Sequence, residues 1–157
     1  MSLKGKHALV TGSSRGIGRG IALKLAGDGV KVAIHYVQNE AAAKDTLAKV
    51  RSLGSDGFIV QADVKKPEEI KAMFRKVADE FGELDIFVSN ARPEAADFFR
   101  APMDITLEQW DTAFDSQAKA FLVGVREAGD HSERDQSRLD RGQRAQQPPE
   151  GGARPYH

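Results

Sequence analysis

Short apolar runs alternate with segments of helical periodicity along most of this chain, and this alternation restricts its fold most strongly. The runs are rich in valine and isoleucine and cover residues 7–11, 30–36, 57–61 and 84–89. Strands and helices that alternate in this way form a parallel sheet with helices on both faces, joined by right-handed crossovers. The sequence therefore predicts an α/β fold with a doubly wound parallel sheet of about four strands.

Two segments outside these runs carry clear helix signals. Residues 67–81 begin with Pro67, which suits a first helical turn, and are followed by Gly82 as a stop signal. Residues 106–109 (TLEQ) have the pattern of a capping box at a helix start. The helix that they begin carries a mainly apolar stripe of Trp110, Ala113, Phe114 and Phe121, which also includes Gln117.

The glycine-rich stretch 11–18 (TGSSRGIG) connects the first run to the first helical segment. A strand, a glycine-rich turn and a helix in this order favour phosphate binding, because the helix start presents unpaired N–H groups and a positive dipole end. Gly12 permits the tight turn, Gly16 lets a ligand approach the backbone, and Gly18 lets the helix pack closely on the strand. A purely structural tight turn is the alternative interpretation.

The composition excludes several classes of function. Lys+Arg and Asp+Glu both total 23, so the net charge is zero, which argues against nucleic acid or an anionic membrane as a partner. The absence of cysteine excludes disulfides and thiolate chemistry. No apolar run is long enough to span a membrane, and the first strand begins too early to leave room for a signal peptide. We expect a cytoplasmic protein, and the sequence predicts no metal site.

The character of the chain changes after about residue 128. All eleven lysines lie at or before Lys119, and Leu139 is the only large aliphatic residue beyond residue 129. Such a segment buries too little apolar surface to offset its ordering entropy, so residues 129–157 are expected to be a disordered tail after a domain of residues 1–128. Translation of a shifted reading frame in GC-rich DNA is one hypothesis for this break, and a truncated paralogue with a diverged tail is the alternative.

Three short motifs follow one another along residues 3–128: TGSSRGIG at 11–18, DV at 63–64 and SNA at 89–91. They resemble the TGxxxGxG fingerprint, the adenine-contacting pair and the NNAG motif of the short-chain dehydrogenase/reductase family, nearest to bacterial 3-oxoacyl and enoyl acyl-carrier-protein reductases. The resemblance implies a Rossmann-like fold of which this chain holds the N-terminal part. It also implies a dinucleotide-binding site formed by Gly12, Ser14, Arg15, Gly16, Ile17, Gly18, Tyr36, Asp63, Val64, Asn90 and Ala91.

The residues after the second run favour NADP(H) over NAD(H). NAD-specific dinucleotide folds place an acidic residue about 20 positions after the glycines, where it binds the ribose 2′-hydroxyl. Tyr36 occupies the corresponding position here, and the first carboxylate after this strand is Glu40. The Arg15 guanidinium suits a 2′-phosphate, with Gln38 and Asn39 as further hydrogen-bond partners. A solvated arginine at a helix start is the alternative interpretation of Arg15.

The acid–base centre that the resemblance implies is missing. The family uses a tyrosine with a lysine four residues later, but neither Tyr36 nor Tyr156 has such a lysine. Gln117 lies at the position of the family's active-site asparagine; a buried amide satisfied by the backbone is the alternative interpretation. Arg92 replaces the glycine of NNAG, where it either alters the loop or points to solvent.

The resemblance also implies missing structure. A whole member of the family has a seven-stranded sheet, so the fourth strand is expected to have an open edge here. The stripe from Trp110 to Phe121 is expected to be exposed, which predicts poor solubility or an oligomer that covers it.

Three functional hypotheses follow from these observations. The lineage is expected to reduce a carbonyl or enoyl group with NADPH, with an acyl thioester as substrate and a link to fatty acid metabolism. This chain alone is expected to be inactive. It is then either a non-catalytic NADP(H)-binding module or a non-functional fragment.

Overall fold

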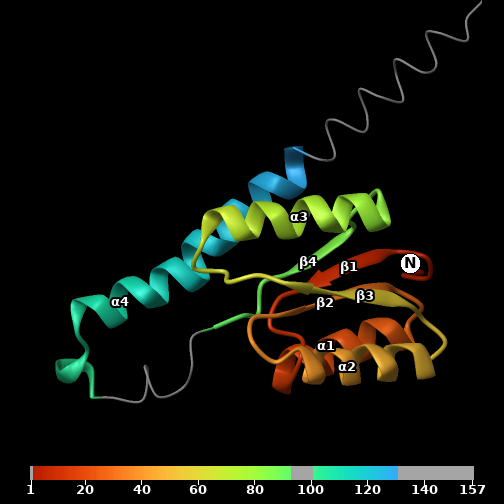
Figure 1. Ribbon diagram of the computed structural model, residues 1–157, viewed down its shortest axis with the longest axis horizontal. Coiled ribbons are helices and arrows are strands. Elements are labelled where there is room, and N and C mark those ends of the chain that lie inside the picture. Colours follow the sequence, from red (N-terminus) through yellow and green to blue (C-terminus); the bar gives the residue numbers. More distant parts are fainter. Residues whose placement is uncertain (1, 93–100, 131–157) are drawn as a thin grey trace, which may run out of the picture.

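A four-stranded parallel sheet lies at the centre of the computed structural model, which describes residues 2–92 and 101–130 (Figure 1). The strands are β1 (His7–Val10), β2 (Lys31–Tyr36), β3 (Gly57–Gln61) and β4 (Ile86–Val88). Their order is β3-β2-β1-β4, and every pairing is parallel. The α/β doubly wound, Rossmann-like fold predicted from the sequence is confirmed.

Helices cover both faces of this sheet. On one face lie α1 (Gly16–Gly27) and α2 (Glu40–Ser52), and on the other lie α3 (Pro67–Phe81) and the C-terminal helical segment (Figure 1). That segment consists of α4 (Leu107–Phe114), the π-helix Asp115–Lys119 and helical residues 120–130, preceded by a 3₁₀ turn at Pro102–Asp104. None of the helices in the described part of the chain has the length and apolar character needed to cross a membrane.

Two hydrophobic cores fill the space between the sheet and its helices. Val32, Ile34 and Tyr36 of β2 face α1 and α2, whereas Ala33 belongs to the core under α3. Successive side chains of a strand point to opposite faces, so a strand that is covered on both sides reads as a continuous apolar run. This is why β2 (KVAIHY) shows no polar alternation, and why its one polar side chain after Lys31, His35, is fully buried.

The predicted elements agree closely with the observed ones, and the differences lie mainly at their ends. Helix α3 covers the predicted range 67–81, and the capping box at Thr106 and Gln109 is present with both hydrogen bonds. The strand predicted over 84–89 is limited to Ile86–Val88. The π-helix Asp115–Lys119 was not expected. The helix continues through residue 130, two positions past the predicted boundary, and the predicted disorder of residues 131–157 lies outside the described residues.

The C-terminal helical segment exposes much of its apolar surface. Trp110, Phe114 and Phe121 of the predicted stripe are each about half exposed, and Leu107 is 82% exposed. Within the described residues, β4 is also an edge strand that pairs only with β1. Both features match the open edge and exposed stripe that the sequence predicts.

Candidate cofactor-binding site

The glycine-rich loop joins the carboxyl end of β1 to the start of α1 in a conformation that requires its glycines. Gly12 and Gly16 have φ values of +67° and +59°, which L side chains rarely adopt. A Cβ on Gly18 would lie 2.4 Å from the Gly12 carbonyl oxygen, so Gly18 is needed for α1 to pack on the loop. A Cβ on Gly16 would meet no atom within 4 Å, which leaves open space beside this backbone.

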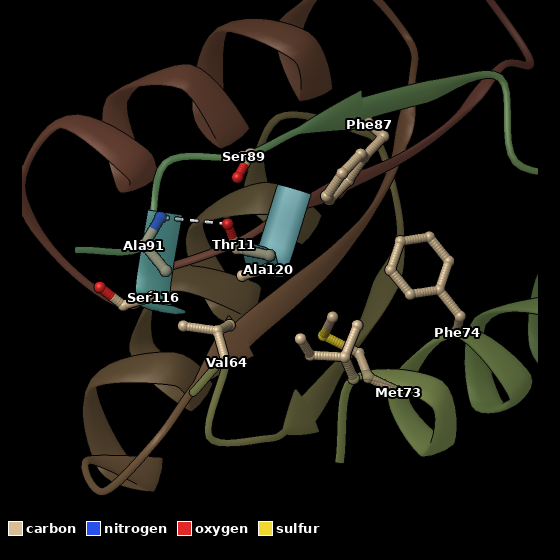
Figure 2. A pocket seen from close by; sticks show the side chains of 10 residues that line it. Thr11, Val64, Met73, Phe74, Phe87, Ser89, Ala91, Ser116 and Ala120 are labelled. Atoms are coloured by element: carbon tan, nitrogen blue, oxygen red, sulfur yellow. Dashed lines mark hydrogen bonds between the residues drawn. The ribbon is translucent and has the colours of Figure 1, made fainter. Parts of the chain in front are cut away.

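Thr11 and Asn90 connect this loop to the carboxyl end of β4. The Oγ1 of Thr11 accepts hydrogen bonds from the backbone N–H groups of Asn90 (2.9 Å) and Ala91 (3.0 Å), the second of which is drawn in Figure 2. The Asn90 side chain donates in return to the Thr11 carbonyl at 3.0 Å. The two loop segments that the sequence assigned to one dinucleotide site are therefore held side by side.

The start of α1 has the features of an anion-binding site. Arg15 is its N-cap residue and makes no side-chain capping hydrogen bond, and the first turn contains no acidic residue. Arg15, Gly16 and Ile17 are exposed, with Ile17 74% exposed. Backbone N–H groups at a helix start attract negative charge through the helix dipole, and an aspartate or glutamate would compete with it. This geometry fits the pyrophosphate of a dinucleotide.

Side chains from α1 and α2 form hydrogen bonds to the middle of the glycine-rich loop. The Ser14 carbonyl accepts hydrogen bonds from the Arg19 guanidinium at 2.7 and 3.2 Å and from the Thr46 hydroxyl at 3.1 Å. Arg19 also forms an ion pair with Asp45 at 3.1 Å. Because the Ser14 carbonyl accepts these bonds from α1 and α2, the backbone of the loop is held in one orientation before any ligand arrives.

The buried side chain of His35, in β2, also forms a hydrogen bond to the glycine-rich loop. Its Nδ1 accepts a hydrogen bond from the Gly12 N–H at 2.8 Å, and its Nε2 lies 2.9 Å from the Ala62 carbonyl oxygen. Its backbone also pairs with Ser13, whose N–H donates to the His35 carbonyl at 3.1 Å. Burial lowers the pKa of the His35 imidazole, and this effect outweighs the opposing contributions of the Ala62 carbonyl and the Asp63 carboxylate.

The residues expected near the adenosine ribose lie after β2. Tyr36 is the last residue of β2 and is buried at 8% exposure, while Gln38 is exposed. Asn39 is the N-cap of α2, and its Oδ1 accepts the Ala42 N–H at 2.9 Å. The structure thus gives the Asn39 side-chain carbonyl a capping role, and Arg15, Gln38 and Asn39 are all exposed.

Asp63 and Val64, predicted to contact the adenine ring, follow β3 at the same edge of the sheet. The Asp63 N–H donates to the Glu69 carboxylate at 2.7 Å, and its own carboxylate accepts the Lys65 N–H at 3.0 Å. Val64 is buried at 8% exposure and faces a small pocket. The turn between β3 and α3 is therefore rigidly held by its own hydrogen bonds.

The small pocket lies between the ends of the strands and the C-terminal helical segment (Figure 2). Its volume is about 10 Å³, close to what one water molecule needs. Polar groups of Thr11, Ser89 and Ser116 line it together with apolar side chains of α3. Ser116 is buried, and its hydroxyl donates to the Thr112 carbonyl at 2.7 Å.

Gln117 lies outside this pocket. It is exposed in the π-helix, so the interpretation of Gln117 as a buried structural amide is wrong. Its neighbour Ser116 is buried, whereas Trp110 and Phe114, which precede the π-helix on the predicted stripe, are already about half exposed. Arg92, at the position of the NNAG glycine, is exposed.

Several supporting residues were not predicted: Ser13, Arg19, His35, Thr46 and Ser116. Their roles depend on contacts across the fold, and four of them carry no motif signal. The position of His35 late in the apolar run 30–36 was the only available indication for this residue. Within the described residues, no cluster of three or more potential metal ligands occurs.

Comparisons with known proteins agree with this geometry. The short chain dehydrogenase family matches residues 6–138. The chain is 37% identical over 123 residues to the 3-oxoacyl-acyl-carrier-protein reductase FabG of Staphylococcus aureus, covering 78% of this chain and 49% of that protein. It is 41% identical over 121 residues to 1-cyclohexenylcarbonyl-CoA reductase of Streptomyces collinus, covering 77% and 42%. The chain thus spans about half the length of the curated relatives that it matches.

A solved structure gives the same result in three dimensions. A short-chain dehydrogenase from Burkholderia cenocepacia J2315 in complex with NADP superimposes with a TM-score of 0.74 at 39% identity, covering 83% of this chain and 52% of that one. The matched family, the identities and the parallel sheet with its glycine-rich loop lead to one conclusion. This chain belongs to the short-chain dehydrogenase/reductase family.

Proposed function

We propose that this chain binds NADP(H) at the glycine-rich loop, with the pyrophosphate on the N–H groups at the start of α1. The observation that carries the proposal is the open backbone at Gly16 above a loop already fixed by Thr11, Arg19 and His35. Preorganised donors bind an anion without a further cost of ordering them. The dinucleotide would supply a hydride at its nicotinamide ring.

The remaining predicted residues are assigned along the carboxyl edge of the sheet. Asp63 and Val64 would contact the adenine, and Asn90 and Ala91 would line the ribose on the nicotinamide side. Ser14 and Ile17 would contribute to the loop around the phosphates. The parallel strands bring these segments to one edge, which is where open α/β sheets bind their ligands.

The preference for NADP(H) over NAD(H) rests on Arg15 and Tyr36. A carboxylate at position 36 would bind a ribose 2′-hydroxyl and repel a 2′-phosphate, whereas Tyr36 carries no charge. Arg15 is exposed beside the loop and offers a planar cation that matches phosphate oxygens. The relative from Burkholderia cenocepacia was solved with NADP, which supports this choice.

We propose that the 157-residue chain binds the cofactor without significant turnover. It contains no tyrosine followed four residues later by lysine, so a proton donor of that type is not available at the nicotinamide. Gln117 offers no replacement, because a side-chain amide does not ionise to supply a proton as a tyrosine does.

A second candidate function is reduction of an acyl thioester by the lineage as a whole. Two relatives carry names of reductases that act on acyl groups attached to a carrier protein or to coenzyme A. NADPH-dependent reduction of a 3-oxoacyl or enoyl thioester by the purified chain would favour this function and contradict the binding-only proposal.

Comparison of the two cofactors in an Arg15 variant tests the proposal. Arg15→Ala is expected to weaken NADP⁺ binding by about tenfold or more, from loss of a charge-assisted contact, and to leave NAD⁺ binding nearly unchanged. Arg126→Ala, on the C-terminal helical segment, is the matched control and is expected to bind both cofactors as the unmodified chain does. Equal loss of both cofactors in Arg15→Ala would contradict the assignment of Arg15 to the 2′-phosphate.

A further inference from the structure

His35 joins three segments of the carboxyl edge of the sheet. Its imidazole accepts the Gly12 N–H at Nδ1 and reaches the Ala62 carbonyl oxygen from Nε2. The Ser13 hydroxyl accepts the backbone N–H of His35 at 3.0 Å. The ring thus links β2 to both the glycine-rich loop and the end of β3.

The two ring contacts require one protonation state and one tautomer. The Gly12 N–H is a donor, so Nδ1 must carry a lone pair, and the Ala62 carbonyl is an acceptor, so Nε2 must carry the proton. Only the neutral Nε2–H imidazole satisfies both partners. A second proton would occupy Nδ1 and place two donors 2.8 Å apart, so the Gly12 amide would have to move.

The surroundings of His35 favour that neutral form. Its side chain is fully buried, and the pKa of the imidazole is lowered from its usual range, chiefly by this burial. Asp63, next to Ala62, acts in the opposite direction. Further charged groups on the elements around it include Arg15 and the Arg19–Asp45 ion pair next to the loop, Lys65 after β3, and the Lys66–Glu69 ion pair at the start of α3.

We propose that His35 is a positioning residue for the dinucleotide phosphates, because its neutral imidazole holds the Gly12 amide and so sets the loop that binds them. The inference rests on the proposed cofactor function and adds a pH dependence to it. Protonation of His35 displaces the loop and weakens binding. By linkage, bound dinucleotide disfavours protonation of His35.

The direction of the pH effect follows from the lowered pKa. The unfolded chain binds a proton at histidine below about pH 6.5, whereas the folded chain resists it to lower pH. The stability that His35 contributes is therefore complete above about pH 6.5 and declines as the pH falls below that value. Cofactor affinity declines at the lower pH where the folded protein takes up the proton.

Three variants separate positioning from general stability. His35→Asn places Oδ1 where the imidazole has Nδ1, so it still accepts the Gly12 N–H but cannot gain a proton. His35→Leu removes the acceptor and leaves the Gly12 N–H and the Ala62 carbonyl without this partner. His7→Asn is the matched control, because His7 lies at the other end of the sheet, stacked on Phe81 with ring centroids 4.6 Å apart.

The experiment measures the affinity of each protein for NADP⁺ and NAD⁺ between about pH 5 and pH 8 by isothermal titration calorimetry. We expect the affinity of the unmodified chain and of His7→Asn for NAD⁺ to fall toward the acid end, while that of His35→Asn stays within about threefold of its neutral value. Ionisation of the 2′-phosphate affects NADP⁺ alone and acts equally on all variants. The same pH dependence in His35→Asn as in the unmodified chain would overturn the inference.

A second readout does not depend on cofactor binding. In ¹⁵N-labelled protein, the imidazole nitrogens of His35 report the tautomer, and the Gly12 amide signal is expected to shift with the titration of His35 and to lose this shift in His35→Asn. If no dinucleotide binds at any pH, the proposed function fails and the Gly12 signal alone decides the positioning role. A Gly12 amide that does not follow His35 overturns it, even where His35→Leu does not fold.

Discussion

Thr11 and Asn90, which lie 79 positions apart, exchange hydrogen bonds across the carboxyl ends of β1 and β4. The Thr11 hydroxyl accepts two backbone N–H groups and lies 3.3 Å from the Val88 carbonyl, to which it donates. This pair unites two of the motifs that the family shares into one loop surface. A dinucleotide that contacts both motifs would therefore bind to one continuous surface that these hydrogen bonds hold together.

Replacement of Thr11 by valine is expected to destabilise the protein by about 1–3 kcal/mol. The variant keeps the shape of the side chain but leaves the N–H groups of Asn90 and Ala91 without their acceptor in a partly buried place. Urea denaturation measures the loss. Thr11→Ser retains the hydroxyl and should lose less than half as much; equal losses would mean that packing of the methyl group, and not the hydrogen bonds, matters at this position.

Gly16 and Gly18 form a matched pair for separating binding from folding. Alanine at Gly18 would place its Cβ 2.4 Å from the Gly12 carbonyl, so we expect a loss of about 3 kcal/mol or a failure to fold. Alanine at Gly16 meets no neighbour and costs about 1–2 kcal/mol from its positive φ. Thermal melts and NADP⁺ titrations of Gly16→Ala should show a folded protein with markedly weaker binding. Undiminished binding would remove Gly16 from the phosphate site.

The fold and part of the site were predictable because they depend on local patterns. Helix α3 was placed to the residue, since Pro67, its apolar stripe and Gly82 all act within the helix itself. The glycine-rich loop was recognised from its glycines and its place between a predicted strand and a predicted helix, and Gly18 has the packing role assigned to it. The β4 strand was overestimated at both ends, because an edge strand forms only where β1 offers a partner.

The supporting residues were not predictable because their partners are distant in sequence. His35 meets Gly12 and Ala62 only after three strands have assembled, and no spacing rule encodes that contact. Gln117 belongs to the stripe that the sequence predicts to be exposed, and the structure exposes it. The π-helix Asp115–Lys119 has no signal in the predicted pattern, and Ser116 is the buried residue within it.

Asp85 is expected to give the protein an acid-dependent part of its stability. It accepts the His7 N–H at 2.9 Å and pairs with Lys6, joining the starts of β1 and β4. Partial burial would raise the pKa of its carboxyl, but the hydrogen bonds from Lys6 and His7 outweigh this and lower it below the usual 3.8. The stabilisation is therefore present above about pH 4 and is lost as the pH falls through the lowered pKa.

Melting temperatures of Asp85→Asn test this expectation. The variant should melt below the unmodified chain at pH 7, and the difference should shrink toward pH 3 as the native carboxyl takes up its proton. Asp28→Asn, which removes an exposed i,i+4 partner of Lys24, is the control and should change little at either pH. A gap between Asp85→Asn and the unmodified chain that stays constant with pH would contradict the role given to the carboxylate.

The exposed apolar side chains of α4 are expected to drive association of the purified chain. Trp110 and Phe114 pack against each other with ring centroids 4.9 Å apart, yet each remains about half exposed. Sedimentation velocity should show concentration-dependent oligomers of the unmodified chain, and the double variant Trp110→Gln, Phe114→Gln should shift it toward monomer. An unmodified chain that stays monomeric at high concentration would contradict the expectation that this apolar surface drives association.

The central claim is that the loop of β1 and α1 is a dinucleotide site that prefers NADP(H). Calorimetric titration of the unmodified chain with NADP⁺ and, separately, NAD⁺ at pH 7.5 tests it most directly. We expect saturable one-to-one binding of NADP⁺ and binding of NAD⁺ that is weaker by about tenfold or more. Tighter binding of NAD⁺ would contradict the assignment of Arg15 and Tyr36, and absence of binding at about 1 mM of either cofactor would contradict the site itself.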